Sequence, residues 1–449
     1  MNFTQYKNKR EFRNAAKAVL NANWTGQFTK PAPSLYPHQW NWDAGFIAIG
    51  YANYDLDRAI AEMRALFAGQ WSNGFLPQII FHPERKEEGQ YFPGADFWQA
   101  HRSAFAPKQV QTSGITMPPV HGFVLWNIYE RCQDKEKALE FLREFYPKVM
   151  ALHRYLYEHR DPQEEGLVHI VHPWESGTDN SPVWDAVLES IDPSQLKIPA
   201  YERKDLQNKK AAQHRPTDLD YDRYVYLVDL YRQNEYADAA IWEKSPFLVQ
   251  DPLFNAILIY SNECMVEVAQ LLGEEVEELI LWNELSIYSM NEKLWNEETG
   301  FYDAWNVRND VRIPSQSASG LIPMLAKVPD QDQAERMLQN ILGAGFIGPD
   351  ENPLLLCPSY SRLSDQFNPQ KYWRGPIWVN INWLLYHGLL HYDFTETAEQ
   401  VKMDTLGLLE KQGFYEYFDP HKLLEADAGY GTNQFSWSAA LCLDFLSMK

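Results

Sequence analysis

The chain has 449 residues, and its 61 Asp and Glu outnumber its 40 Lys and Arg to give a formal net charge of −21. So negative a field repels phosphate backbones, and no run of basic residues interleaved with aromatics offsets it, which argues against nucleic acid as a partner. A neutral substrate is not repelled, whereas an anionic substrate needs a local arginine. With 45% apolar residues the chain has ample material for a large core.

Targeting signals are not evident in the sequence. The N-terminal stretch has no apolar core followed by a small-residue cleavage site, and no apolar run approaches the length that spans a membrane. The four cysteines have neither CxxC nor metal-ligand spacing and lie beside apolar residues, which predicts buried reduced thiols. We therefore expect a cytoplasmic protein.

Helical periodicity dominates, with apolar residues recurring at three- and four-residue spacing and most segments ending at Gly, Pro or Asn. In chain order the predicted helices are 10–23, 42–54, 56–71, 120–132, 135–160 (one long helix or two abutting ones), 221–234, 251–273, 275–295, 317–328, 332–342, 375–392, 395–412 and 433–448. Strand signals are few and short, as at 167–173 and 413–420.

Several predicted helices are apolar nearly all round, notably 376–391 and 434–447. A helix without a polar face must be buried on all sides. About a dozen helices of alternating exposure, with no Gly/Ser linker between them, predict one closed, all-α helical array rather than separate bundles. Segments 294–306 and 411–420 share Gly-Phe-Tyr-acid after a helix, which predicts similar turns at the ends of two helical units.

Aromatic residues make up 14% of the chain, with 16 Trp, 25 Tyr and 23 Phe. Many belong to the core, yet several lie in Gly/Pro-rich loops where packing alone does not require an indole. Aromatic loops on a rigid helical scaffold suit sugars, whose C–H faces stack on rings while their hydroxyls seek carboxylates and amides.

The segment YPHQWNWDAGF places Trp40 and Trp42 just before Asp43, at the start of a predicted helix. Asp43 is either only the N-cap of that helix, worth about 1 kcal/mol, or a carboxylate that clamps a sugar hydroxyl beside the two rings. The clustered aromatics favour the second interpretation, because capping does not account for them.

The segment HPWESGTDNSP puts Trp174 at a loop entrance, followed by Glu175 and Asp179. A general acid needs a carboxyl held against apolar walls so that it stays protonated near neutrality. Loop carboxylates are mostly solvated, and on local grounds either carboxyl is the candidate.

In GFYEYFDP, Glu416 lies between Tyr415 and Tyr417, which strand alternation turns to the opposite face. The related turn at 300–303 carries Asp303, so the pattern alone does not separate the two carboxyls.

Two further segments supply aromatic residues together with an arginine. KYWRGPIWVNINW holds Trp378 in the first turn of a predicted helix, where it can form the wall of a pocket. Arg215 precedes a proline in a loop with Tyr221 and Tyr224, and it is either exposed or holds an anionic group.

No HExxH, GxSxG or phosphate-binding loop is present among the motifs. Paired carboxylates are therefore the expected catalytic apparatus, and we expect neither a metal nor a cofactor. A small-molecule sugar is the expected partner, membranes are not, and self-association is left open.

Six segments, in order along nearly the whole chain, resemble glycoside hydrolase family 63, and most closely its bacterial mannosylglycerate and glucosylglycerate hydrolases. They are WNWDAGF, TSGITMPPV (112–120), WESGTDNSP, YWRGPIWVNINWLL (372–385), FYEYFDP and GTNQFSWSAAL (431–441). The resemblance implies an (α/α)6 toroid over residues 1–449 with short β-hairpins in its loops, and insertions at about 70–115 and 190–225 that cover the active-site end.

The resemblance also implies hydrolysis of an α-glucoside or α-mannoside with inversion, best glucosylglycerate or mannosylglycerate, and otherwise neutral disaccharides or oligosaccharides. Asp179 matches the general acid and Glu416 the general base, and Arg215 with Tyr221 or Tyr224 matches the carboxylate clamp. The expected sugar-binding residues are Tyr36, Trp40, Trp42, Asp43, Tyr91, Trp174, Tyr372, Trp378 and Gln434. The chain departs from the family at Met117, where relatives often have glutamine, which leaves the identity of the sugar open.

Two alternatives of other classes remain. A sugar epimerase on the same fold favours paired histidines as acid and base, and no motif supplies such a pair beside the aromatic loops. A non-catalytic sugar-binding protein tolerates the loss of either carboxyl without losing its ligand.

Overall fold

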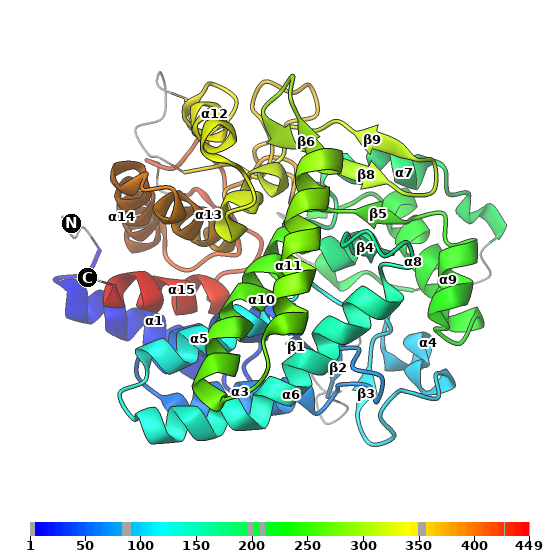
Figure 1. Cartoon of the computed structure of the whole chain (residues 1–449). Coiled ribbons are helices and arrows are strands. Elements are labelled where there is room, and N and C mark those ends of the chain that lie inside the picture. Colours follow the sequence, from blue (N-terminus) through cyan, green and yellow to red (C-terminus); the bar gives the residue numbers. More distant parts are fainter. Residues whose placement is uncertain are drawn as a thin grey trace.

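The structure is a computed structural model that describes residues 5–82, 91–195, 201–206, 212–348, 356–425 and 427–448. It is mostly helical, at 55% helix, as the periodicity predicts (Figure 1). Parts of the two predicted insertions, residues 83–90, 196–200 and 207–211, lie outside the described residues. In the described part of the chain, no helix is long and apolar enough to cross a membrane.

Six inner helices pack side by side in chain order, and the last contacts the first. They are α2 (Asn41–Ala52), α5 (His121–Arg131), α10 (Pro252–Leu272), the 3-10 helix η9 (Ala318–Ala326), α13 (Val379–His391) and α15 (Ser436–Ser447). The contacts run α2 to α5, α5 to α10, α10 to η9, η9 to α13, α13 to α15 and α15 back to α2. The inner elements therefore form a closed ring.

Each inner element has an outer helix packed against it. The outer helices are α1 (Lys9–Asn23) on α15, α3 (Leu56–Phe67) on α2, α6 (Lys135–His159) on α5, α11 (Glu277–Ser289) on α10, α12 (Gln331–Leu342) on η9 and α14 (Thr395–Gln412) on α13. Shorter helices lie in the connections: α4 (Ala95–Trp98), α7 (Asp185–Glu189), α8 (Asp218–Gln233) and α9 (Asp238–Lys244).

Residue pattern explains which helices are inner and which are outer. Every residue of α2 is buried, and α15 is buried from Ser436 to Leu446, as expected of helices without a polar face. Outer helix α12 instead buries only Ala334, Met337 and Ile341, which recur on one side of the helix, and a capping box at Asp330 fixes its start.

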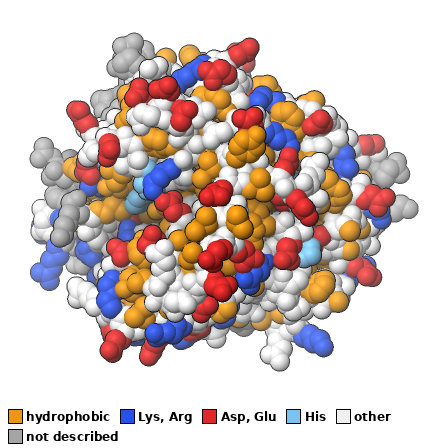
Figure 2. Space-filling view, viewed as in Figure 1, with side chains coloured by type: hydrophobic (Ala, Val, Ile, Leu, Met, Phe, Trp, Pro, Cys, Tyr) orange, Lys and Arg blue, Asp and Glu red, His pale blue; other side chains and the backbone are white. Residues whose placement is uncertain are grey.

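Outer helix α11 lies on the outside of the molecule (Figure 1). It exposes an apolar stripe of Leu281, Leu285 and Tyr288, spaced by four and three residues along one helical face. The face seen in Figure 2 mixes such apolar side chains with many acidic ones.

Two predicted helices differ in detail from the structure. The stretch expected to form one long helix or two abutting ones forms one helix, α6 (Lys135–His159), despite Pro147. The helix predicted at 317–328 winds instead as the 3-10 helix η9 (Ala318–Ala326), which contains Pro323. Asp43 is not an N-cap, because α2 begins at Asn41 and Trp40 occupies the cap position.

Short strands connect the helices at the site end. A sheet of order β1-β2-β3 joins β1 (Gln39–Trp40), β2 (Ile79–Phe81) and β3 (Gln111–Thr112), with Trp40 opposite Ile79 and Ile80 opposite Thr112. A second sheet has the order β4-β5-β8-β9, from β4 (His169–Ile170), β5 (Val249–Gln250), β8 (Ala304–Asn306) and β9 (Val311–Ile313). Two hairpins pair β6 (Trp295–Asn296) with β7 (Phe301–Tyr302), and β10 (Tyr417–Phe418) with β11 (Gly429–Tyr430).

The repeated Gly-Phe-Tyr segments both turn at a glycine in the left-handed region, Gly300 at φ 70° and Gly413 at φ 86°. Their acids have different surroundings. Asp303 is buried and held by Asn296, the backbone of Ser315 and Arg312, which is a structural arrangement.

Candidate active site

A pocket of about 880 Å³, counting the open space at its mouth, collects side chains from residues 31 to 437. It brings together most of the predicted site residues: Tyr36, Trp40, Trp42, Asp43, Tyr91, Trp174, Asp179, Arg215, Tyr221, Tyr224, Tyr372 and Glu416. Met117 lines it as well. Chain segments far apart in sequence thus supply one aromatic, acidic site.

Two predicted binding residues lie outside this lining. Trp378 is buried behind Trp373, which lines the pocket and stacks on Trp378 at 3.8 Å between ring centroids and an interplanar angle of 2°. The wall is therefore Trp373, and Trp378 supports it. Gln434 has an exposed side chain and a backbone φ of 54°, and the neighbouring lining residues are Phe435 and Trp437.

Asp179 follows a 3-10 turn, η3 (Pro173–Ser176), and the left-handed Gly177. A Cβ at Gly177 would stand 2.5 Å from the ring of Trp42, so the glycine lets this loop approach that ring. Burial raises the pKa of Asp179 to about 7, and the charge of Glu416 adds to this while Arg215 opposes it. A carboxyl of this kind holds its proton near neutrality, as a general acid must.

A network behind Asp179 fixes its loop against the loop of Trp373. The backbone N–H of Trp373 donates to Asn180 Oδ1 at 2.9 Å, and Arg374 donates to the Asn180 carbonyl at 3.1 Å. Arg374 also forms an ion pair with Asp185. These contacts fix the position of the Asp179 loop relative to the aromatic wall formed by Trp373.

Glu175, the other candidate in this loop, is fully buried and bonded on both oxygens. It accepts from the backbone N–H groups of Thr116 at 3.0 Å and Val171 at 2.7 Å, and it pairs with Arg160 at 3.1 Å. It joins three segments and does not line the pocket, so its role is structural.

Glu416 is 1% exposed and receives three donors. Tyr36 Oη donates to Oε1 at 2.7 Å, while Arg215 Nη2 and the backbone N–H of Thr432 donate to Oε2 at 2.8 and 3.1 Å. Gly431, at φ 73°, permits the last contact, since a Cβ there would meet Oε2 at 2.2 Å. These donors fix the orientation of the Glu416 carboxyl group, which suits a general base.

Arg215 therefore has a role that the sequence did not suggest, because it forms an ion pair with Glu416. Its guanidinium also lies over the ring of Tyr372, 4.4 Å from the centroid. Its Nε has no partner among the described residues. Arg215 therefore keeps one N–H without a hydrogen-bond partner among the described residues.

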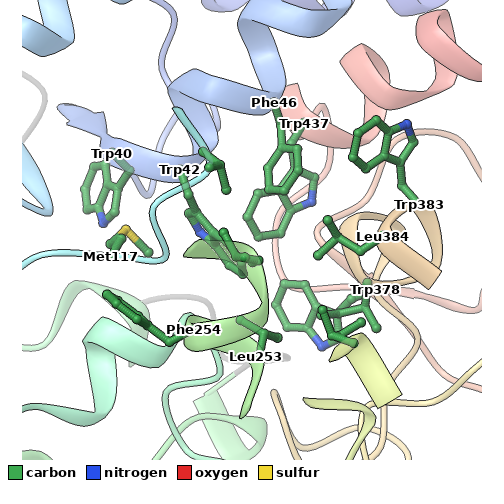
Figure 3. Packing of buried hydrophobic residues seen from close by; sticks show 14 of the residues in the cluster. Trp40, Trp42, Phe46, Met117, Leu253, Phe254, Trp378, Trp383, Leu384 and Trp437 are labelled. Carbon is green, nitrogen blue, oxygen red and sulfur yellow. The ribbon is translucent and has the colours of Figure 1, made fainter. Parts of the chain in front are cut away.

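The aromatic walls meet one another edge to face. Trp40 contacts Tyr36 at 5.1 Å and Tyr91 at 5.2 Å between ring centroids, and Trp42 contacts Trp437 at 5.5 Å. Figure 3 shows Trp40 and Trp42 entering from the start of α2, with Met117 beside Trp40. Such packing fixes ring faces on which a sugar can stack.

Asp43 lies in the first turn of α2, and burial raises its pKa well above the usual range. The charges of Glu416 and Asp179 raise it further. Asp43, Asp179 and Glu416 therefore influence one another in this pocket, and their surroundings differ. Glu416 forms an ion pair with Arg215, whereas burial has the largest effect on Asp179.

Further lining residues escaped the sequence reasoning. Trp373 and Trp437 lie in two of the aromatic segments that resemble the family, so the sequence did indicate that these segments belong to the site. Gln78 and Asp205 had no pattern to mark them. The charge of Asp205 is balanced by Arg203, which donates to both of its oxygens at 3.2 and 2.7 Å.

The arrangement is that of acid–base catalysis on a sugar. It offers Asp179, whose pKa burial raises to about 7, Glu416 with its three donors, and aromatic walls. No histidine occurs among the described residues that line the pocket, so an epimerase with a histidine pair finds no support in its geometry.

Comparison with known proteins agrees with this geometry. The family model of the mannosylglycerate hydrolase MGH1-like glycoside hydrolase domain matches residues 36–438. The chain is 42% identical to a mannosylglycerate hydrolase of Rubrobacter radiotolerans, over 96% of this chain and 95% of the relative. It is 33% identical to a glucosylglycerate hydrolase of Mycolicibacterium hassiacum, over 96% of this chain and 97% of the relative.

Solved structures give the same result. The glycoside hydrolase family 63 mannosylglycerate hydrolase from Thermus thermophilus, in complex with Tris and D-glycerate, superposes with a TM-score of 0.87 at 41% identity, over 96% of this chain and 99% of that one. The chain therefore belongs to the mannosylglycerate hydrolase-like branch of glycoside hydrolase family 63, and it is a glycoside hydrolase.

Proposed function

We propose that this enzyme hydrolyses an α-glycoside of glyceric acid, glucosylglycerate or mannosylglycerate, with inversion at the anomeric carbon. The observation that carries the proposal is the pairing, in one pocket, of Asp179, whose pKa burial raises to about 7, with Glu416, which accepts hydrogen bonds from three donors. The names of the similar enzymes point to the same substrates.

In the proposed reaction Asp179 gives its proton to the glycosidic oxygen as the bond from that oxygen to the anomeric carbon breaks. Glu416 takes a proton from a water molecule on the opposite face of the sugar ring, and the water oxygen bonds to the anomeric carbon. Glycerate leaves with the proton of Asp179. Inversion requires about 6.5–9.5 Å between the two carboxyls, so that the water fits between them.

Arg215 is the proposed contact for the glycerate carboxylate. It is the one Lys or Arg among the described residues that line the pocket, and its Nε has no partner in the described structure. Tyr91, Tyr221 and Tyr372 line the same pocket and would surround the aglycone. An arginine among tyrosines can bind a carboxylate in a pocket that is otherwise acidic.

The fold and location complete the proposal. The closed ring of α2, α5, α10, η9, α13 and α15, each with an outer helix, supports a single (α/α)6 toroid over residues 1–449. Residues from both predicted insertions, including Tyr91 and Arg215, line the pocket. This supports the proposal that the insertions cover the active-site end of the toroid. The four cysteines are buried and unpaired, which supports a cytoplasmic location.

Neutral α-glucosides are the second candidate substrates. Four carboxyl residues line the pocket (Asp43, Asp179, Asp205 and Glu416) against Arg215 alone, and Arg215 is already paired with Glu416. This excess of acidic residues is the observation that keeps a neutral disaccharide as the alternative substrate.

A direct screen tests the proposal. The purified enzyme is incubated with glucosylglycerate, mannosylglycerate and α-linked glucobioses, and the products are followed by proton NMR. We expect free sugar from a glycerate glycoside, with the β-anomer appearing first because inversion of an α-linkage gives it. First appearance of the α-anomer would exclude inversion, and release of sugar only from glucobioses would favour the second candidate.

Replacing Arg215 with Ala is expected to raise KM for the glycerate glycoside at least tenfold, because the carboxylate loses its cationic partner. The kcat falls for every substrate, since Glu416 loses a donor as well. Steady-state kinetics on the glycerate glycoside and on a neutral α-glucoside separate the two effects.

The matched control is Tyr36→Phe, which removes another donor to Glu416 without removing a positive charge. We expect it to lower kcat while leaving the ratio of KM values for the two substrates near that of the parent. If Arg215→Ala raises KM equally for both substrates, Arg215 does not bind the glycerate carboxylate.

A further inference from the structure

Gln78 is the polar lining residue with no role in the chemistry described above. Its side chain lies in the pocket lining and the residue is 5% exposed. Its Oε1 has no hydrogen-bond partner among the described residues. A buried amide oxygen without a partner is uncommon in folded proteins and calls for an explanation.

The backbone of Gln78 is fixed on both sides. Its carbonyl accepts from the N–H of Asn41 at 2.9 Å, and its own N–H donates to the carbonyl of Ile115 at 2.6 Å. The next residue, Ile79, pairs with Trp40 in the sheet. The position of the amide is therefore set by a rigid frame, as a recognition group requires.

The two residues bonded to the backbone of Gln78 lie close in sequence to residues that line the pocket. Asn41 stands between Trp40 and Trp42, and Ile115 is two residues before Met117. Met117 lies beside Trp40 in Figure 3, and its thioether can neither donate a hydrogen bond nor accept a strong one. Gln78 and Asp43 are therefore the side chains near these walls that can make polar contact with a sugar, and Gln78 carries the unpartnered oxygen.

We propose that Gln78 binds a ring hydroxyl of the glycosyl unit and determines which sugar the enzyme accepts. The hydroxyl donates to Oε1, and the amide NH2 can donate to a neighbouring oxygen. The inference rests on the proposed function and deepens it, because it places recognition of the sugar, rather than of the aglycone, on this residue. Gln78 is a binding residue and takes no part in proton transfer.

The test uses monodeoxy analogues of the α-glycoside that the enzyme cleaves, one for each ring hydroxyl. In the parent enzyme, removing the hydroxyl that Gln78 binds should lower kcat/KM by about tenfold or more, because the buried oxygen is left without a partner. In Gln78→Met, which keeps the approximate size and removes both polar atoms, the same removal should change kcat/KM by less than about twofold. The loss of kcat/KM caused by removing any other ring hydroxyl should be the same in Gln78→Met as in the parent enzyme.

Met117→Leu is the matched control. It alters the apolar neighbour and leaves the amide, so the tenfold ratio between the intact and deoxy substrates should survive whatever happens to the absolute rate. If Gln78→Met leaves every deoxy ratio as in the parent, or lowers all substrates uniformly, the assignment is overturned.

Thermal unfolding separates binding from a structural role. A structural glutamine lowers the melting temperature when it is replaced. A ligand-binding one does not, since Gln78→Met removes a buried unpartnered oxygen. The rise in melting temperature caused by the free monosaccharide should instead shrink. A lower ligand-free melting temperature together with an undiminished rise would contradict the inference.

The same measurements distinguish failure of the inference from failure of the proposed function. If no α-glycoside is cleaved while Gln78→Met still reduces the monosaccharide-induced rise, the proposed function fails and the assignment of Gln78 stands. If hydrolysis is intact and the deoxy ratios of the two proteins are equal, only the assignment fails.

Discussion

Asp179→Asn and Glu416→Gln are each expected to lower kcat/KM for the α-glycoside substrate by roughly 10²–10⁴-fold, the usual contribution of a positioned acid or base. The two losses differ in kind. An aryl glycoside with an acidic leaving group needs no proton, so it should recover much of the activity of Asp179→Asn. Activity of Glu416→Gln should not recover, because activation of the water is what it lacks.

The pH dependence follows from the same assignment. Burial raises the pKa of Asp179 to about 7, so the protonated acid is present below this pH and is lost as the pH rises through it. The alkaline limb of kcat/KM should therefore fall near pH 7 on the natural substrate and flatten for the aryl glycoside. Glu189→Gln serves as the control, because Glu189 is an exposed acidic residue that follows the loop of Asp179. This variant should keep the pH profile of the parent enzyme.

Near-parental hydrolysis of every α-glycoside by both Asp179→Asn and Glu416→Gln would refute the catalytic assignment. If only one of the two variants keeps near-parental hydrolysis, the catalytic role of the residue replaced in that variant is refuted and the other role stands.

Arg160→Met should cost about 3–5 kcal/mol of the free energy of unfolding, because it leaves the Glu175 carboxylate buried without its cation. Both side chains are almost wholly inaccessible to solvent. Urea unfolding at neutral pH measures the change. The double variant Arg160→Met with Glu175→Gln should recover part of the loss, since no unpaired charge remains.

The control is a surface ion pair. Arg64 and Glu144 approach to 2.6 Å, and Arg64 is 61% exposed, so Arg64→Met should cost at most about 1 kcal/mol. A loss for Arg160→Met as small as the loss for Arg64→Met would show that Glu175 does not depend on Arg160.

Much of the fold was predictable from the sequence, because the period of apolar residues distinguishes a helix with one buried face from a helix buried all round. The pattern predicts that 376–391 and 434–447 are buried on all sides, and they form the inner helices α13 and α15. The start of α2 was not predictable to the residue: Asp43 is a good capping residue, yet Trp40 holds the cap position because β1 ends there. Tertiary pairing overrides the local preference.

The site was predictable in part for a similar reason. Local pattern left Glu175 and Asp179 equal, and the family resemblance favoured Asp179. The structure adds the physical difference, since Glu175 is bonded to Arg160 and two backbone groups whereas Asp179 faces the pocket. The stacking of Trp373 on Trp378, and the ion pair of Arg215 with Glu416, depend on segments that meet only in three dimensions.

The closure of the ring has a consequence for folding. The first outer helix, α1, packs on the last inner helix, α15, and the two helices lie side by side in Figure 1. Contacts between segments so far apart in the sequence close a long loop and form slowly. The pocket takes Tyr36 and Asp43 from one end and Glu416 and Trp437 from the other. During synthesis, activity must therefore appear only after the C-terminal helix has left the ribosome and docked, so partly made chains expose aromatic walls without a working site.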